Sequence, residues 1–251
     1  MAGRRPARRR GGQMSEHRRS RSVAQTFLTD LLESQLAEWQ SRVGGRSASV
    51  VDIGGGTGGL AVGLAAQGHT VTVVDPSPDA LAALQRRAAE ADLTDYITAL
   101  QGDTGDLSSL LGPSSTDVVV CHRVLEYLPD PRQGLADIAG VLHEQGALSL
   151  LVAQRHPVVV SQAVSGDFAH ARRTWADARM LDRTRVQRLL EEAGWDVRAV
   201  HGIGAISEHV PERHLEGPDR YRELLALERE VSEDPAFASV APWVHFLATP
   251  G

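Results

Sequence analysis

The sequence of 251 residues contains no lysine, a single cysteine and few aromatic residues, and each shortage excludes a class of site. With Cys121 as the only cysteine, the chain has neither an internal disulfide nor a cysteine-cluster metal site, which is typical of a reducing cytoplasm. Because all 26 basic residues are arginine, no lysine is available as a catalytic base. No apolar run approaches the roughly 18 residues of a membrane span. We therefore expect a cytoplasmic protein with an aliphatic core.

Charge is distributed unevenly along the chain. Residues 1–22 contain eight arginines among Gly, Pro and Ser and no apolar stretch, which predicts a disordered tail and not a secretory signal. Such a block would screen RNA phosphates, or it is a dispensable extension upstream of a second start at Met14. The rest of the chain is acidic, so any contact with nucleic acid outside the tail would have to be local.

The most informative stretch runs from Val50 to Gly59, where an apolar segment leads into a glycine-rich turn. Glycine lets main-chain N–H groups approach a ligand at the start of the next helix. Asp75 ends the second apolar segment, where a ribose-binding carboxylate is expected. The spacing of Gly54, Gly56 and Gly59 alone also fits a dinucleotide site, so an NAD-dependent oxidoreductase is one interpretation.

Asp52 favours a different nucleoside cofactor. It lies two residues before the first glycine, where a strand should be apolar, and a buried carboxylate needs hydrogen-bond donors. The D-x-G-x-G-x-G pattern of Asp52, Gly54, Gly56 and Gly58 resembles the first motif of class I S-adenosylmethionine-dependent methyltransferases. In that superfamily the acid helps to order the glycine turn, and the later carboxylate binds both ribose hydroxyls. The resemblance implies S-adenosyl-L-methionine as the cofactor.

Strand-like and helical segments alternate along the chain, which predicts a mostly parallel α/β sheet with helices on both faces. The superfamily resemblance implies a Rossmann-like sheet of seven strands whose last strand is antiparallel. We expect strands at residues 49–53, 70–74, 97–100, 117–121, 147–152 and 243–247, and helices at residues 23–39, 58–67, 79–91 and 218–232. We expect a tail at 1–22 and a methyltransferase domain at 23–251, divided into an N-terminal helix (23–45), a cofactor-binding core (46–155), a substrate-covering insertion (156–185) and the C-terminal part of the sheet (186–251).

Functional residues in such folds lie beyond the carboxyl ends of the strands. After the third strand, residues 102–106 read G-D-T-G-D, either a turn that holds an adenine or a turn closed only by its own side chains. After the fourth strand comes His122, which contacts the cofactor, acts as a base or is merely structural. Arg155 and His156 follow the fifth strand. We predict His122 and His156 as catalytic residues, and Arg155, His156 and Arg173 as substrate contacts.

The run H-R-V-L-E-Y-L-P-D-P-R-Q-G-L (residues 122–135) is similar to the tRNA 5-carboxymethoxyuridine methyltransferase family, whose members methylate the carboxylate of a modified wobble uridine. The similarity extends from about Ala48 to the C-terminus. It implies a role in tRNA processing, with either tRNA or a small molecule as the methyl acceptor. The resemblances together imply the following cofactor-binding residues: Asp52, Gly54, Gly55, Gly56, Asp75, Asp103, Thr104, Gly105 and His122.

The chain also departs from that family. The N-terminal signature, with its cofactor-contacting arginine, is not recognisable in residues 22–43, and Gly204 stands where the family has an arginine that faces the substrate carboxylate. A methyltransferase of a small molecule is therefore an alternative, and a non-catalytic RNA-binding protein is another. His209 and His214 match no standard metal-site spacing, so we expect no metal and no membrane contact.

Overall fold

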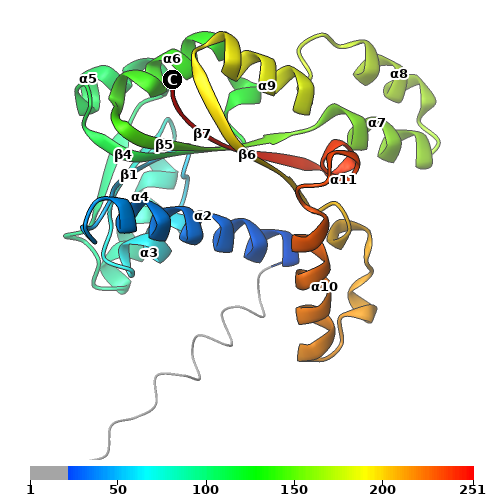
Figure 1. Ribbon diagram of the computed structural model, residues 1–251, viewed down its shortest axis with the longest axis horizontal. Coiled ribbons are helices and arrows are strands. Elements are labelled where there is room, and N and C mark those ends of the chain that lie inside the picture. Colours follow the sequence, from blue (N-terminus) through cyan, green and yellow to red (C-terminus); the bar gives the residue numbers. More distant parts are fainter. Residues whose placement is uncertain (1–21) are drawn as a thin grey trace, which may run out of the picture.

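The computed structural model describes residues 22–251, so the predicted tail, apart from Ser22, lies outside the described residues. A seven-stranded sheet in the order β3-β2-β1-β4-β5-β7-β6 forms the centre of the molecule (Figure 1). Its strands are β1 (Ser49–Ile53), β2 (Thr70–Asp75), β3 (Ile97–Gln101), β4 (Thr116–His122), β5 (Leu142–Ala153), β6 (Trp195–Ile203) and β7 (Trp243–Pro250).

The five strands β3, β2, β1, β4 and β5 are parallel, and β7 runs antiparallel to both β5 and β6. The predicted Rossmann-like sheet with an antiparallel last strand is therefore confirmed. The strand order reverses between β1 and β4, and ligands of open α/β sheets bind beyond the carboxyl ends of the strands at this point.

Helices cover both faces of the sheet (Figure 1). One face packs against residues of α5, α6 and α9, and the other against residues of α2, α3 and α4. The helices are α2 (Val23–Arg42), α3 (Gly59–Ala65), α4 (Pro78–Glu90), α5 (Leu107–Leu111), α6 (Pro131–Val141), α7 (Arg155–Val164), α8 (Phe168–Ala176), α9 (Arg183–Glu192), α10 (Pro218–Val231) and α11 (Pro235–Val240). Short 3₁₀ turns occur at η1 (Thr104–Asp106), η2 (Leu125–Tyr127), η3 (Ser207–His209) and η4 (Glu212–His214).

Local sequence explains where the helices beside the site begin. Ser77 accepts a hydrogen bond from the N–H of Ala80 at the start of α4, and Asp130 accepts from two N–H groups at the start of α6. In both helices proline follows the capping residue, a position where its missing N–H costs nothing. The caps mark where the loops after β2 and β4 end, and so they limit the length of the loops at the carboxyl ends of these strands.

The structure adds elements that lie outside the expected ranges, among them β6, α5, α6, α9 and α11, and it differs from the expectation at β5 and at residues 156–185. Strand β5 begins at Leu142, not at residue 147. Three exposed polar residues follow Leu142, so the start of the strand lacks the apolar pattern that would predict it. The predicted insertion at 156–185 folds as two helices, α7 and α8, followed by the start of α9. Helix α7 has no fully buried residue, and its main neighbours are the helices α8 and α11.

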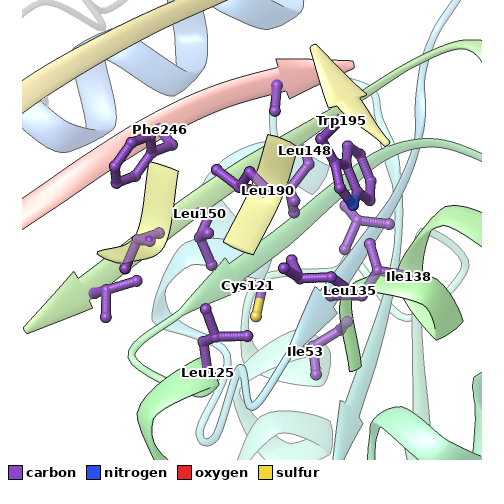
Figure 2. Packing of buried hydrophobic residues seen from close by; sticks show 14 of the residues in the cluster. Ile53, Cys121, Leu125, Leu135, Ile138, Leu148, Leu150, Leu190, Trp195 and Phe246 are labelled. Carbon is purple, nitrogen blue, oxygen red and sulfur yellow. The ribbon is translucent and has the colours of Figure 1, made fainter. Parts of the chain in front are cut away.

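The core beneath one face of the sheet is aliphatic, as its composition predicts. Leu148 and Leu150 of β5 lie between Leu190 of α9 and Cys121 of β4, with Trp195 and Phe246 at the borders (Figure 2). Cys121 is fully buried, and burial raises the pKa of its thiol to about 12. The cysteine is therefore a packed, protonated thiol and not a nucleophile.

Leu150→Ala is expected to lower the free energy of unfolding by about 2–5 kcal/mol, because it leaves a cavity in this core. The matched control is Val164→Ala on α7, where the side chain is 84% exposed and should change the value by less than about 0.5 kcal/mol. Urea unfolding followed by circular dichroism measures both. Equal effects of the two substitutions would contradict the packing described here.

Candidate functional site

The carboxyl ends of β1, β2, β3 and β4 bring most of the predicted cofactor-binding residues to one edge of the sheet. The glycine turn after β1 is the first of these segments. Gly54 and Gly56 have φ of +68° and +56°, a region that side chains disfavour. A Cβ at Gly55 would lie 2.4 Å from Asp52 Oδ2, and one at Gly54 would lie 2.5 Å from Val124 Cγ2. The turn therefore presents bare backbone in a space that only glycine fits.

Asp52 is 3% exposed, and its Oδ2 has no hydrogen-bond partner among the described residues. Burial and, to a smaller extent, the negative charge of Asp75 together raise the pKa of this carboxyl to about 7. Two carboxylates held this close disfavour an anionic ligand and favour a cationic one. A sulfonium nucleoside fits this requirement, whereas the pyrophosphate of a dinucleotide would add negative charge.

Asp75 ends β2 and is 7% exposed. Its Oδ1 accepts a hydrogen bond from the Ser77 N–H at 2.9 Å, and its Oδ2 accepts one from the Gly56 N–H at 2.9 Å. These bonds fix the carboxylate against the glycine turn and leave further lone pairs on both oxygens. The arrangement suits a pair of ribose hydroxyls.

The turn at residues 102–106 is closed by its own groups. Asp103 Oδ1 accepts from the Gly105 N–H at 2.8 Å, while the Asp103 N–H donates to Asp106 Oδ2 at 3.1 Å. Asp103 and Gly105 are exposed, but Thr104 is buried with its hydroxyl toward Gly134. A ligand at this turn would thus meet Asp103 and backbone groups before the Thr104 side chain.

His122 ends β4 and is half-buried. Its Nε2 lies 2.9 Å from Ser149 Oγ, and burial lowers the pKa of the imidazole to about 3, with a smaller contribution from the positive charge of Arg123. The ring is therefore neutral at physiological pH. A neutral ring beside the two carboxylates keeps positive charge away from the place that a cationic cofactor would occupy.

The predicted substrate residues lie on α7 and α8. Arg155 forms an ion pair with Asp182 at 2.6 Å, and its guanidinium lies 4.7 Å from the centre of the Trp175 ring. The His156 ring is 5.9 Å from the same tryptophan, and its buried Nδ1 has no partner among the described residues. Arg173 is exposed. The structure therefore groups Arg155 and His156 around Trp175, while His122 contacts a different set of residues.

Sequence analysis missed the polar residues behind His122. Ser149 lies in the middle of β5 with no exposed surface, and its Oγ also lies 2.9 Å from His245 Nε2. His245 in turn contacts His201. A serine inside the apolar run L-S-L-L-V was a signal, because a buried hydroxyl needs a partner. The two histidines carried no such signal, since their strands pair only in the folded chain.

A cavity of about 730 Å³ lies between α2 and α3 and reaches His122. Leu28 and Leu32 of α2 line one side, and Leu60 and Gly63 of α3 line another, whereas the glycine turn and Asp75 are not part of its lining. Helix α2 thus covers the space beside the predicted cofactor position. Among the described residues, no helix has the length and apolar character to cross a bilayer, and no three His, Cys, Asp or Glu residues are arranged to hold a metal.

Comparison with known proteins gives the class. A family model described as a methyltransferase domain matches residues 51–148, which contain the glycine turn, Asp75 and His122. The tRNA 5-carboxymethoxyuridine methyltransferases of Escherichia coli O157:H7 and K12 are 28% identical over 234 residues, covering 90% of this chain and 87% of theirs. The ubiquinone biosynthesis O-methyltransferase of Xanthomonas campestris pv. campestris (strain B100) is 32% identical over 127 residues, covering 50% of this chain and 52% of that protein.

Solved structures share the fold at low sequence identity. The plantazolicin methyltransferase BamL, in complex with a triazolic desmethylPZN analog and SAH, has a TM-score of 0.61 at 13% identity and covers 95% of this chain and 89% of its own. The [4+2]-cyclase SpnF has a TM-score of 0.59 at 17% identity, covering 89% of this chain and 80% of its own. The chain carries a methyltransferase domain and is an S-adenosyl-L-methionine-dependent methyltransferase, which confirms the predicted class, enzyme activity and cofactor.

The raised pKa of Asp52 predicts a pH dependence of stability. Between the usual value of 3.8 and about 7, the folded protein keeps a proton that the unfolded chain has released, so this carboxyl's contribution is present below about pH 4 and is lost as the pH rises through about 7. Asp52→Asn removes the titration. Its free energy of unfolding relative to wild type should rise by about 2.5 kcal/mol between about pH 5 and pH 8.

Urea unfolding at the two pH values measures this difference. Asp95→Asn, at an exposed aspartate, is the matched control and should show no comparable change. A constant difference between Asp52→Asn and wild type across this range would mean that Asp52 is ionised at both pH values.

Proposed function

We propose that the methyl acceptor is a carboxylate on a modified wobble uridine of tRNA. The observation that carries this proposal is the similarity to the E. coli tRNA 5-carboxymethoxyuridine methyltransferases, which spans 90% of this chain and includes the segments outside the methyltransferase domain. The cofactor core alone would not distinguish acceptors, because it is common to the whole class. Such an acceptor would place the activity in the cytoplasm.

For the cofactor we propose three contacts. The backbone of Gly54, Gly55 and Gly56 approaches its methionine part, with Asp52 ordering the turn. The Gly55 N–H is the donor left for the ligand, because the Gly54 and Gly56 N–H groups donate to Val74 O and Asp75 Oδ2. Asp75 binds both ribose hydroxyls, and the turn from Asp103 to Gly105 holds the adenine. These roles are supported by the fixed Asp75 carboxylate and by the glycine backbone that a Cβ would obstruct.

The surface of α7 and α8 suits RNA. Phe168 is 67% exposed and Trp175 is 55% exposed, and Arg172 and Arg173 are exposed without an ion pair or hydrogen bond to any described residue. Residues 155–179 hold four arginines and two acidic residues, whereas residues 22–251 hold 18 arginines and 31 acidic residues. Exposed aromatic rings stack on bases, and arginines bind phosphates. This is where we propose local RNA contact in an acidic protein.

An anionic acceptor also needs a positively charged residue to bind it. Gly204, which stands where the tRNA methyltransferase family has an arginine, does not supply that charge. We propose that Arg123 does. It follows His122 directly, is exposed, and makes no hydrogen bond or ion pair through its side chain with another described residue. Its φ of +58° is disfavoured for a residue with a side chain, and such strain persists where the surroundings impose it. The backbone there is held by the Arg123 N–H, which donates to Leu151 O at 2.7 Å.

The reaction is an in-line displacement. The cofactor supplies a methyl group that its positive sulfur already activates. The protein aligns the acceptor oxygen at about 3–3.5 Å from the methyl carbon and excludes water. A carboxylate acceptor releases no proton, so His122 and His156 then position groups and accept nothing from the nucleophile.

A small hydroxyl compound is the second candidate acceptor. The similarity to the ubiquinone biosynthesis O-methyltransferase favours it, although that similarity covers only half of each chain. A hydroxyl acceptor must lose a proton, and His122 or His156 would then serve as the base. The nature of the acceptor therefore decides whether either histidine takes part in proton transfer.

The direct test compares the nucleosides of tRNA from cells with and without the gene by mass spectrometry. The proposal predicts loss of the methyl ester at the wobble uridine and its recovery when purified protein and S-adenosylmethionine are added. An unchanged wobble-uridine profile would exclude the tRNA acceptor and leave the small-molecule candidate.

Asp75→Ala is expected to weaken binding of S-adenosylmethionine at least tenfold, because hydrogen bonds to a charged group contribute about 1.5–3 kcal/mol each. Asp79→Ala, at an exposed carboxylate in the first turn of α4, is the control and should bind as wild type does. Isothermal titration calorimetry measures both affinities. Unchanged affinity of folded Asp75→Ala would exclude the ribose role.

Arg172→Glu combined with Arg173→Glu is expected to raise the KM for tRNA at least fivefold, because two phosphate-binding charges are reversed. The Kd for S-adenosylmethionine should not change, since both residues lie on α8 away from the glycine turn. Arg220→Glu on α10, also exposed, is the control. An unaltered KM for tRNA at low salt would show that RNA binds elsewhere.

A further inference from the structure

A row of polar side chains crosses the otherwise apolar sheet behind His122. Ser149 Oγ lies 2.9 Å from His122 Nε2 and 2.9 Å from His245 Nε2, and His245 Nδ1 lies 3.2 Å from His201 Nδ1. Beyond them, His201 Nε2 lies 3.7 Å from Glu233 Oε1. The first four residues come from β4, β5, β7 and β6, which are neighbours in this order in the sheet (Figure 1). The row therefore runs from His122, at the edge of the sheet where we expect the cofactor, to the exposed Glu233 on the surface beside β6.

The three imidazoles in this row are neutral. Burial lowers the pKa of His122 to about 3 and also lowers the pKa of His201 and His245, and the proximity of the rings to one another adds to the effect at His245. The charges that face them are Arg123 beside His122 and Glu233 beside His201. Each neutral imidazole has one N–H and one bare nitrogen, so every link has one donor and one acceptor.

Two arrangements of the protons satisfy all the links and also give the Ser149 O–H an acceptor in the row. If the hydroxyl accepted from both imidazoles, its own proton would be left without an acceptor in the buried sheet. In the first, His122 Nε2–H donates to Ser149 Oγ, the hydroxyl donates to His245 Nε2, and His245 Nδ1–H donates to His201 Nδ1. His201 then carries its proton on Nε2, toward Glu233, and His122 Nδ1 is bare. In the second arrangement every donor and acceptor is exchanged, and His122 Nδ1 carries the proton.

Glu233 selects between the two. Its side chain is 77% exposed in the turn between α10 and α11, and an ionised carboxylate offers only acceptors. At 3.7 Å the contact with His201 Nε2 is too long for a hydrogen bond, so the negative charge acts through its field. That field favours a proton on the nitrogen that faces it, which is the first arrangement.

We propose that Ser149, His245, His201 and Glu233 are positioning residues that hold His122 in its Nε2–H form and leave Nδ1 as a bare acceptor beside the cavity between α2 and α3, next to the predicted cofactor position. The ring lines that cavity, and Nδ1 has no hydrogen-bond partner among the described residues. A lone pair suits a cationic cofactor, because the other tautomer would direct an N–H donor toward positive charge. This proposal does not depend on the identity of the methyl acceptor, because the tautomer of His122 is set by the protein's own residues.

Glu233→Lys tests the chain from its far end. An ammonium group is a donor, so it should leave His201 Nε2 bare and reverse every link as far as His122. In ¹⁵N-detected NMR of the cofactor-free protein, His122 is expected to show a bare Nδ1 in the wild type and a protonated Nδ1 in Glu233→Lys. Glu230→Lys, an equal change of charge at an exposed position of α10, is the control and should keep the wild-type signature.

A protonated Nδ1 in the wild type, or the same signature in Glu233→Lys and the wild type, would overturn the proposal. Neither result involves the acceptor, so neither bears on the tRNA assignment. Both variants lie on the surface, and circular dichroism confirms that they fold.

Ser149 provides a second test inside the chain. Ser149→Ala removes the hydroxyl that joins two imidazoles, so His122 should lose its single tautomer and give a mixed signature. Affinity for S-adenosylmethionine by calorimetry should fall about tenfold, the factor that one hydrogen bond of about 1.4 kcal/mol represents. Ser149→Thr keeps the hydroxyl and should restore both readouts. A wild-type signature and affinity in folded Ser149→Ala would overturn the proposal, and if that variant fails to fold, Glu233→Lys decides alone.

Discussion

The site depends on two carboxylates that the fold brings to one glycine turn. The backbone of the turn and its continuation donates one hydrogen bond to each oxygen of Asp75 but leaves Oδ2 of Asp52 without a donor among the described residues, so the negative charge there is only partly compensated. Burial in a sheet that is packed on both faces makes this charge costly and raises the pKa of the Asp52 carboxyl to about 7. The same crowding makes glycine obligatory at position 55, where a Cβ would collide with the Asp52 carboxylate. A cationic ligand relieves the repulsion, and this explains why the turn suits a sulfonium cofactor better than a dinucleotide.

The parts of the fold that sequence predicts are those whose signal is local. The apolar run that ends at Ile53 and the glycines after it specify a strand and a turn without reference to the rest of the chain, and the structure agrees with the expected bounds there. The start of β5 and the helices α7 and α8 were not predicted, because their polar or exposed residues depend on neighbours distant in sequence. The buried row behind His122 is the extreme case, since Ser149 and His245 are 96 positions apart and meet only when β5 pairs with β7.

The antiparallel strand β7 has a role beyond completing the sheet. Inserted between β5 and β6, it places His245 directly across from His201 in the β6–β7 ladder, while Ser149 lies on the strand on its other side. Polar groups in the interior of a sheet are stable only when every donor finds an acceptor, and the alternating tautomers provide this without any buried charge. The insertion of the last strand thus allows a polar connection through a core that is otherwise aliphatic.

Charge is separated along the site edge in a way that serves methyl transfer. Of the side chains that we assign to the cofactor, Asp52 and Asp75 are acidic and His122 is neutral. Three exposed arginines that make no side-chain hydrogen bond or ion pair with another described residue lie on the acceptor side that we propose, Arg123 on the loop after β4 and Arg172 and Arg173 on α8. A positively charged methyl donor and an anionic acceptor attract each other. An enzyme that joins them therefore has to bind each reactant beside charges of the opposite sign and exclude water from the space between them. Opposite fields at the two halves of one edge achieve this, because each half binds one reactant and repels the other.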